Sequence, residues 1–210
     1  MAINRRDIVQ MLRHENQELK ARNQKIDARL TRHQQAFRAL NRMDETMRAM
    51  HSEFDLNRLI NDLLTLALHA CDAENGSLVL VDDAADELVF AEVIGETREH
   101  LLNHRIGLDT GIVGHVVKTR KAMRVTDVRN SARWSSEVDQ VIGFNTNALM
   151  CAPLYDNDKI YGAIEVVNNI SSEEFGQNDL AILRVTARFV SQALREAEDI
   201  TITGTDLSRY

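Results

Sequence analysis

The stretch from Phe144 to Leu180 constrains the fold more than any other part of the chain. It contains two short apolar runs separated by the polar residues 156–159, and a long helical pattern begins at its end. Two apolar runs that flank a polar four-residue turn are typical of a β-hairpin. Gly162, inside the second run, indicates a close approach of backbone or ligand. The stretch therefore predicts a hairpin that leads into a helix.

The composition predicts one globular domain with an appendage. The chain has 210 residues, of which 44% are hydrophobic and 27% are charged. This balance is globular rather than disordered. There is no run of about eighteen apolar residues, and the N-terminal residues are charged rather than hydrophobic, so neither a membrane span nor a secretory signal is expected. Cytoplasmic residence is the resulting expectation.

The two cysteines are too few for a disulfide framework. Cys71 falls on the apolar face of a helical pattern, and Cys151 lies in an apolar strand. Buried cysteines commonly act as small hydrophobic residues, and we interpret both in this way. A redox pair is the alternative.

Residues 1–50 form a basic arm in front of an acidic domain. The arm has eleven Lys and Arg against six Asp and Glu, whereas the remainder has fourteen against twenty-six. An acidic domain does not favour nucleic acid. A basic-zipper DNA reader would concentrate its positive charge ahead of the heptads, but here the charge is distributed through them. No nucleic-acid partner is therefore expected.

The arm carries a heptad repeat. With Leu12 at position d, the apolar d positions and two a-position asparagines are typical of a parallel two-stranded coiled coil, in which paired asparagines set the register. Glu15 can then meet Lys20 of a second copy, and Arg22 can meet Asp27. The predicted dimer seam consists of Leu12, Asn16, Leu19, Asn23, Ile26 and Leu30.

After Leu40 the a positions become polar while an apolar stripe continues beside them. This drift predicts that the helix leaves the coiled coil there and packs on its own domain. The alternative is a single amphipathic helix that lies on its own domain throughout.

The elements that follow alternate between helical and strand patterns. Leu56 to Cys71 is a single-faced helical pattern with Asp55 as its N-cap, and residues 74–76 (Glu-Asn-Gly) are a turn signal. The expected strands 77–81 and 88–94 are joined by a turn at 82–86 and form an antiparallel hairpin. The other expected strands are 121–125 and the two strands of the hairpin described above. The expected short helices are 96–104, the segment after Gly111, and 135–141. A final helix is expected from Gln177 to Asp199.

This order predicts the α+β class. We expect a central antiparallel sheet of about six strands, with helices on one face and a pocket roofed by short helices and loops on the other. The predicted units are a coiled-coil helix over residues 1–50, a domain over residues 51–198 and a flexible tail over residues 199–210.

The chain resembles the GAF family, whose members are small-molecule sensor domains, from about residue 40 to 197. The resemblance rests on several motifs that occur in the family's order. They are Gly-Leu-Asp-Thr-Gly-Ile-Val-Gly (107–114), Asp-Val-Arg-Asn-Ser-Ala-Arg-Trp (127–134), Gly-Phe-Asn-Thr (143–146), Cys-Ala-Pro-Leu (151–154) and Gly-Ala-Ile-Glu-Val-Val-Asn (162–168).

The cyclic-nucleotide-binding branch of the family carries an Asn-Lys…Phe…Asp-Glu signature, which is incomplete here. Asn168, Phe175 and Asp179 match it, whereas Asn169 replaces the lysine and Leu180 replaces the glutamate. In the family the lysine and aspartate brace the fold near the pocket. The resemblance implies that a weaker hydrogen bond between Asn169 and Asp179 takes the place of that ion pair.

By resemblance, the roof of the pocket supplies the ligand contacts. Trp134 sits where nucleotide-binding members place an aromatic residue beside the base, and Ser135 offers a hydrogen bond. Asp139 and Thr146 are expected to contact polar edges of the ligand, and the helix that includes Ile112 is expected to point its N-terminal amides at an anion. Alternatively, Trp134 fills a closed core and Thr146 caps a strand.

Other polar residues are weaker candidates. Glu165, in an apolar strand, is expected to be a pocket acid with a raised pKa or a structural carboxylate. His115 is a ligand-binding candidate, and in some redox-sensing relatives a histidine ligates haem, although no cofactor is expected here. His100 and His104 are spaced for a metal on a helix, but no third ligand is evident and no metal is predicted.

We interpret the chain as a non-catalytic, small-molecule-sensing module of a dimeric signalling protein, with a cyclic nucleotide as one candidate ligand. Its signal would pass to a separate output protein. The alternatives are a ligand-free dimerisation scaffold and a thiol-dependent methionine sulfoxide reductase, although the two cysteines lack the close grouping that such a reductase uses.

Overall fold

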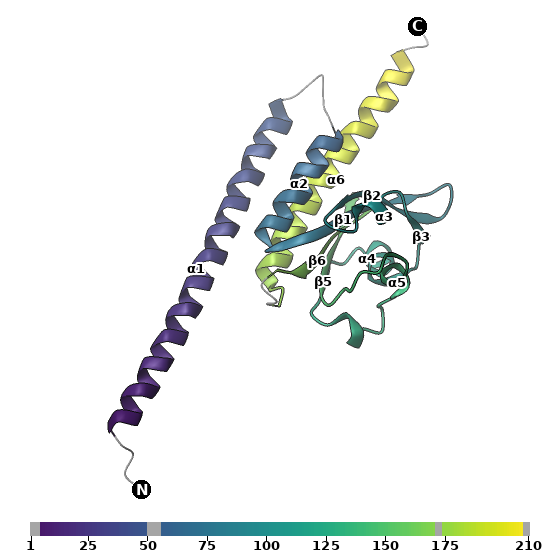
Figure 1. Ribbon diagram of the computed structural model, residues 1–210. Coiled ribbons are helices and arrows are strands. Elements are labelled where there is room, and N and C mark those ends of the chain that lie inside the picture. The colour runs from purple at the N-terminus through teal and green to yellow at the C-terminus, as the bar shows by residue number, and fades with distance from the viewer. Residues whose placement is uncertain (1–4, 50–55, 171–173, 208–210) are drawn as a thin grey trace.

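The computed structural model describes residues 5–49, 56–170 and 174–207 (Figure 1). Its helices are α1 (Arg5–Ala49), α2 (Leu56–Ala70), α3 (Arg98–Leu101), α4 (Gly111–Thr119), α5 (Glu137–Ile142) and α6 (Gln177–Leu207), with a 3₁₀ turn at Val128–Asn130. Its strands are β1 (Ala73–Asp82), β2 (Glu87–Ile94), β3 (Arg105–Gly107), β4 (Met123–Val125), β5 (Leu149–Asp156) and β6 (Lys159–Asn169). The predicted α+β class is confirmed.

The strands form a single six-stranded sheet in the order β3-β2-β1-β6-β5-β4. Every neighbouring pair is antiparallel. The two hairpins, β1–β2 and β5–β6, were predicted from their turns, and the structure confirms both. Strands β1 and β6 pair at the centre, from Ala73 with Asn169 to Leu80 with Gly162. This central pairing joins the first and last strands of the domain.

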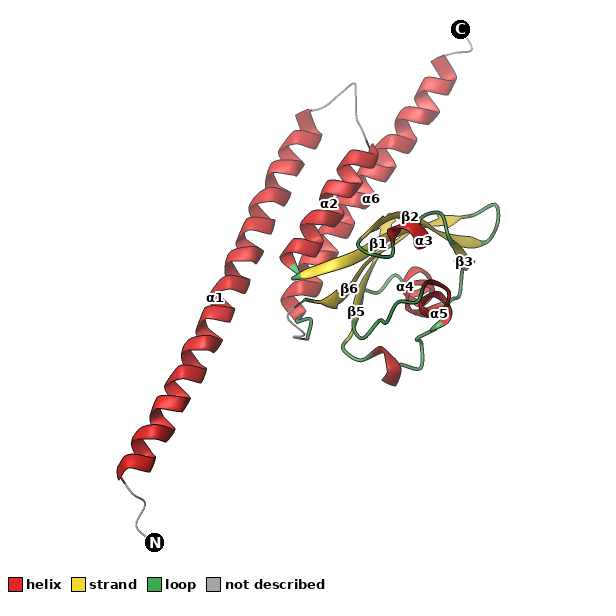
Figure 2. Ribbon diagram, in the orientation of Figure 1, coloured by secondary structure: helices red, strands yellow, loops and turns green. Residues whose placement is uncertain are grey.

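Helices cover both faces of the sheet (Figure 2). The long helices α2 and α6 lie on one face, and the short helices α3, α4 and α5 lie on the other. Because successive side chains of a strand point to opposite faces, β1 places Leu78 in the core under α2 and α6 and Val79 in the core on the other side. Burying a side chain of this size contributes about 1.5–3 kcal/mol. The sheet therefore separates two apolar cores.

Helix α1 lies outside α2 and α6, as an outer layer on the same side of the sheet (Figure 1). It contacts the domain from Arg29 onward, and Ala36 is buried in a small cluster with Ala70 and Ile182. The sequence predicted that this packing starts after Leu40, so the contact begins earlier than expected. None of the described helices combines the length and apolar composition needed to cross a membrane.

Several boundaries differ from those predicted. Residues 74–76 form part of β1 rather than a turn, and the chain reverses instead at Asp72, which has a φ of 57°. Gly76 is small because a Cβ there would lie 2.6 Å from the carbonyl oxygen of Glu165 on the neighbouring strand. Strand β3 was not expected. Helix α6 continues to Leu207, beyond the expected start of a tail at residue 199, and Asp55 lies outside the described residues.

Gly162 marks the closest approach between the two central strands. Its φ is 151°, and a Cβ at this position would lie 1.9 Å from the carbonyl oxygen of Val79. An atom cannot fit at that distance from the backbone of β1. The close backbone approach that the sequence indicated at Gly162 is therefore present.

We expect Gly162→Ala to lower the free energy of unfolding by roughly 3 kcal/mol or more, because β1 and β6 would have to separate. Urea unfolding monitored by circular dichroism measures the change. Gly143→Ala is the matched control: Gly143 also has a positive φ, of 69°, but a Cβ added there would have no other atom within 4 Å. This control should cost only about 1 kcal/mol. Equal losses in the two variants would contradict the steric explanation.

Candidate functional site

A partly open chamber of about 80 Å³ lies between the sheet and the short helices. Its floor comes from β1, β2, β5 and β6, and its roof comes from the segments around α3, α4 and α5. Its lining residues are Asn75, Gly76, Ser77, Phe90, Val93, Thr97, Leu101, Ile106, Thr110, Gly111, Ile112, Val113, Trp134, Ser135, Val138, Asp139, Phe144, Thr146, Leu149, Glu165 and Val167. Most of these side chains are apolar, and none is basic. The chamber is thus a small apolar space with two carboxyl groups.

Glu165 is the polar centre of the floor. It is buried on β6, directly opposite Ser77 of β1, and the Ser77 hydroxyl donates a hydrogen bond to Oε2 over 3.3 Å. Burial raises the pKa of Glu165 to about 7, although hydrogen bonds from Ser77 and Cys151 oppose the shift. Removing a carboxylate from water disfavours its charged form. Near neutral pH, Glu165 can therefore either donate or accept a hydrogen bond.

The roof is closed by a contact between two of the predicted ligand residues. The Asp139 carboxylate accepts hydrogen bonds from the backbone amide of Thr146 over 2.8 Å and from its hydroxyl over 2.9 Å. Thr146 is buried, and its amide and hydroxyl groups both find their hydrogen-bond acceptor, the Asp139 carboxylate, within the roof. Asp139 on α5 thereby holds the segment that returns to β5.

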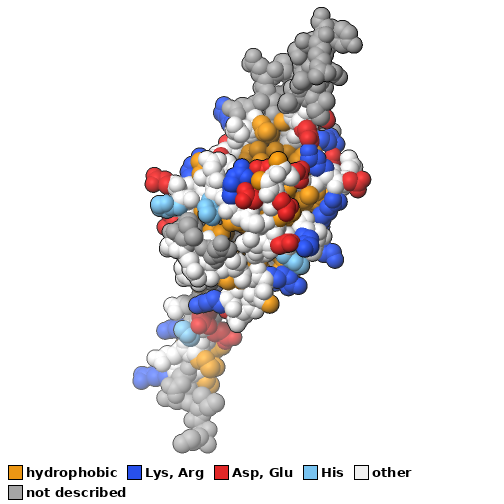
Figure 3. All heavy atoms as spheres, turned by 90° about the vertical axis from the view of Figure 1, so that its right-hand side faces the viewer, with side chains coloured by type: hydrophobic (Ala, Val, Ile, Leu, Met, Phe, Trp, Pro, Cys, Tyr) orange, Lys and Arg blue, Asp and Glu red, His pale blue; other side chains and the backbone are white. Residues whose placement is uncertain are grey.

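Trp134 and the start of α4 form the rest of the roof. Trp134 is half-buried and packs on the core cluster of the roof side, and Ser135 lies next to Gly111. Helix α4 begins at Gly111, so its first turn, which contains Ile112 and Val113, faces the chamber. The face seen in Figure 3 shows charged side chains of both signs with hydrophobic ones between them.

Asn168, at the end of β6, ties the chamber wall to the sheet. It adopts a left-handed conformation with a φ of 50°. Its side-chain oxygen accepts hydrogen bonds from the amides of Asn147 and Ala148 over 2.8 Å and 3.2 Å, and its amide group donates to the carbonyl of Asn145 over 2.9 Å. Asn168 therefore fixes the segment that carries Thr146.

The other signature residues brace the helix side. Phe175 is fully buried in the core under α2 and α6. The side chain of Asn169 donates to the carbonyl of Cys71 over 2.9 Å. The predicted hydrogen bond between Asn169 and Asp179 is not formed among the described residues. Asp179 instead binds Arg29 and His33 of α1.

Some sequence candidates lie away from the chamber. His115 is on α4 but is not among the lining residues. His100 lies in the short α3, whereas His104 follows the end of that helix and packs beside Phe90. Among the described residues, no group of three or more His, Cys, Asp or Glu side chains is placed to hold a metal.

The two cysteines lie on opposite sides of the sheet. Cys71 belongs to the core under α2 and α6, and Cys151 belongs to the core on the roof side. Both are buried, and burial raises the pKa of each thiol well above its usual value. They are placed as small core residues and are too far apart in the fold to act as a close pair.

The sequence reasoning missed several lining residues, including Ser77, Thr97 and Thr110. Ser77 carried a usable signal: it begins an apolar strand, as Glu165 interrupts another, and polar residues within buried strands often pair across a sheet. Thr97 and Thr110 lie in connections whose path depends on the packing of the roof. No local pattern distinguishes them from other loop residues.

Comparison with known proteins places the chain in a family. The sequence model of the GAF domain family matches residues 55–194, which include every residue that lines the chamber. The chain therefore belongs to the GAF family. The predicted family is confirmed, whereas the match does not identify a ligand.

Two kinds of relative are informative. The dual 3′,5′-cyclic-AMP and -GMP phosphodiesterase 11 of Drosophila melanogaster is 24% identical over 168 residues, which cover 73% of this chain and 12% of the relative. The chain thus spans only about an eighth of that protein. The GAF domain of a phosphoenolpyruvate-protein phosphotransferase from Coxiella burnetii has a TM-score of 0.66 at 15% identity, covering 83% of this chain and 96% of that domain.

The fold is also shared with an enzyme. The free methionine-R-sulfoxide reductase of Neisseria meningitidis, solved with its substrate, has a TM-score of 0.58 at 18% identity and covers 74% of this chain and 86% of that one. At this level of identity the likeness concerns the fold alone. Function must be argued from the residues of the chamber.

We expect Glu165 to make stability depend on pH. Its pKa is about 7 in the folded chain against 4.5 for an ordinary glutamate, so the folded state holds the proton more tightly. The free energy of unfolding should fall by about 3 kcal/mol in total as pH rises from 4.5 to 7. Above pH 7, the titration of Glu165 should cause no further change. Urea unfolding across this range measures the fall.

Glu165→Gln should remove this part of the decline, because the amide does not titrate. Glu99→Gln is the control, since Glu99 is exposed on α3 and should leave the pH dependence unchanged. An identical pH profile for the wild type and Glu165→Gln would show that Glu165 titrates normally.

Proposed function

We propose that the chain is a non-catalytic, small-molecule-sensing GAF module of a dimeric signalling protein. The observation that carries the proposal is the chamber between sheet and short helices, with a buried carboxyl group on its floor and a roof of short segments. A mostly apolar enclosure with few polar groups is typical of small-molecule sites. Cytoplasmic residence and a separate output protein remain predictions of the sequence.

A cyclic nucleotide is the ligand hypothesis that sequence similarity favours. It is supported by the similarity to the phosphodiesterase, by the aromatic ring of Trp134 in the roof and by the first turn of α4 at the chamber. The geometry adds two conditions. The chamber holds only about 80 Å³, so a nucleotide requires the roof to move outward. No basic side chain lines it, so the phosphate would depend on the backbone amides of α4.

The other two functions are less well supported. The small volume of the chamber favours a ligand-free scaffold as the second candidate. A sulfoxide reductase requires reactive cysteines, whereas Cys71 and Cys151 are buried in separate cores, and their raised pKa values disfavour thiolates. We therefore propose no catalytic role.

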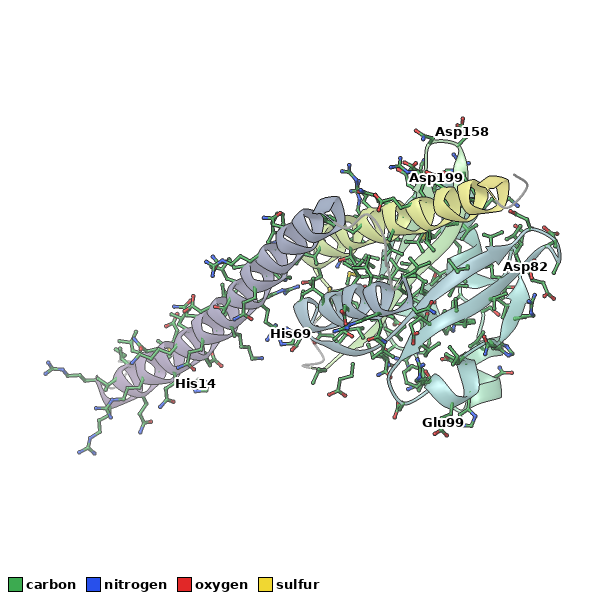
Figure 4. All side chains as sticks on the ribbon, turned by 90° about the horizontal axis from the view of Figure 1, so that it is seen from above. His14, His69, Asp82, Glu99, Asp158 and Asp199 are labelled. Carbon is green, nitrogen blue, oxygen red and sulfur yellow. The ribbon has the colours of Figure 1, made fainter. Side chains whose placement is uncertain are left out.

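The dimer is supported by the free surface of α1. The apolar seam residues Leu12, Leu19, Ile26 and Leu30 are each more than half exposed in the single chain. Figure 4 shows His14 on the part of α1 that extends beyond the domain, where the domain does not cover the helix. Exposed leucines repeated at heptad spacing bury their surface when a second helix pairs with them. A parallel coiled coil with a second copy is the proposed partner.

We expect cyclic AMP or cyclic GMP to stabilise the purified chain. A ligand at about 100 times its Kd adds about 2.7 kcal/mol to the free energy of unfolding, which raises the Tm by roughly 5–10 °C in a chain of this size. Thermal unfolding at increasing ligand concentration measures the shift. Trp134→Ala should abolish it, whereas Tyr155→Ala, which alters an exposed aromatic residue outside the chamber, should not.

A flat melting profile at millimolar concentrations of both nucleotides would exclude them as ligands. Native mass spectrometry of the protein isolated from its source then distinguishes the remaining functions. A retained small molecule would support sensing of another compound, and an empty dimer would support the scaffold.

We expect Leu19→Glu with Ile26→Glu to convert the dimer to a monomer, because like charges would face each other in the seam. Sedimentation equilibrium measures the mass. Ala21→Glu with Ala28→Glu is the matched control: both alanines are exposed on α1 away from the seam, and the change in net charge is the same. A dimer that survives the seam substitutions would contradict the coiled coil.

A further inference from the structure

Asp179, at the start of α6, is the least solvent-exposed charged residue in the described part of the chain. Its side chain is only 2% exposed. Within its own segment, Oδ2 accepts a hydrogen bond from the amide of Gly176 over 2.6 Å, which satisfies one free amide at the helix start. A buried carboxylate also needs an opposite charge. Its own domain does not supply one among the described residues.

Helix α1 supplies that charge from far away in the sequence. The guanidinium of Arg29 donates to Oδ2 of Asp179, and Nε2 of His33 lies 2.9 Å from Oδ1. Gly176 makes room for this contact, since a Cβ there would lie 2.8 Å from Nη2 of Arg29. Next to this pair, Arg32 of α1 lies 3.4 Å from the carboxylate of Asp72, at the end of α2.

Within residues 8–38 of α1, whose side chains the structure describes, apolar burial contributes little to the packing on the domain. In the part of the helix whose side chains are described, only Ala36 is buried, whereas Leu30 and Phe37 are more than half exposed. A single alanine methyl group stabilises packing by only about 1 kcal/mol. In this described part of the helix, the polar contacts around Asp179 are therefore the main attachment of α1 to the domain.

A path made of hydrogen bonds, the backbone of residues 168–170 and the ion pair between Arg32 and Asp72 joins these contacts to the chamber wall. Asn168 holds residues 145–148, which include the chamber residue Thr146. The next residue, Asn169, donates to the carbonyl of Cys71, and the amide of Ile170 donates to the carbonyl of Asp72 over 2.7 Å. Asp72 is the residue that Arg32 contacts. The end of β6 thus touches both the roof segment and the attachment of α1.

We propose that Asp179, Arg29 and His33 form an electrostatic clasp that sets the position of α1 on the GAF domain and couples that position to the roof of the chamber. Opening the clasp releases α1 while the domain stays folded, because neither of the two domain cores includes a described side chain of α1. Conversely, a roof displaced by a ligand shifts the end of β6 and weakens the attachment. This coupling to a ligand rests on the proposed function, whereas the clasp itself does not.

The position of α1 can be measured with spin labels on cysteines introduced at Ala21 of α1 and Thr65 of α2, both exposed. Cys71 and Cys151 are buried and would stay unlabelled. Labelled chains mixed with excess unlabelled chains report distances within one chain. We expect Arg29→Ala to replace a narrow distance distribution with a broad one, whereas Arg38→Ala, an exposed arginine on the same helix, should leave it unchanged.

Two further variants test the role of Asp179. Asp179→Asn should also broaden the distribution, and Arg29→Ala should then have no added effect, because the charge that it neutralises is gone. If Arg29→Ala does not fold, Arg29→Lys replaces it, and we expect it to broaden the distance distribution to a smaller extent. An unchanged distribution in the Arg29 variant, or an equal effect of Arg29→Ala with and without Asp179, would overturn the clasp.

Hydrogen exchange without any ligand tests the coupling to the roof. Arg29→Ala should speed exchange of amides in residues 139–148 about tenfold relative to wild type, which corresponds to the loss of one charged hydrogen bond. Release of α1 with no change in the roof would overturn the coupling and leave the clasp. Because these measurements use ligand-free protein, a failure of cyclic nucleotides to bind does not affect their outcome.

Discussion

The pairing of β1 with β6 is the contact on which the rest of the domain depends. Each strand sends alternate side chains to the core under α2 and α6 and to the core on the roof side. The same pairing sets Ser77 opposite Glu165 on the chamber floor, and its lower end carries Asn168 and Asn169. A shift of one residue would exchange the two faces. Gly76 and Gly162, each close to the opposite backbone, are compatible with this register.

Burying the carboxyl group of Glu165 on the chamber floor costs desolvation free energy, and no ion pair with a described residue offsets that cost. Glu165 is held by Ser77 and Cys151 and keeps its proton near neutrality because of burial. A protonated carboxyl donates a hydrogen bond that a carboxylate cannot. The floor can therefore match either a donor or an acceptor on a ligand, depending on the ligand and on pH. This adaptability suits a sensing site better than a core that needs only to be filled.

The elements that follow local patterns could be predicted from the sequence. The period of α2 and the two hairpins were evident because each depends on neighbouring residues, and the motif order indicated the family. The contact between Arg29 and Asp179 could not be predicted, since 150 residues separate the partners and no periodicity relates them. The turn predicted at residues 74–76 was wrong for a related reason. Gly76 is required by the close backbone of β6 on the neighbouring strand and not by a turn. Trp134 and Thr146 both line the chamber, but the hydrogen bond from Thr146 to Asp139 depends on packing that no local pattern reveals.

The incomplete signature and helix α1 are linked through Asp179, because α1 supplies the charged partners of this signature residue. Asn169 carries no charge and cannot neutralise Asp179, so within the described residues the charge that pairs with this carboxylate comes from α1. The helix that precedes the domain thus supplies the cation that the incomplete signature lacks. The seam residues Leu12, Leu19 and Ile26 lie on the free part of that same helix, before the clasp. In the proposed dimer this helix would pair with a second copy at one end and neutralise a buried charge at the other, so the geometry of the dimer and the state of the domain would depend on each other.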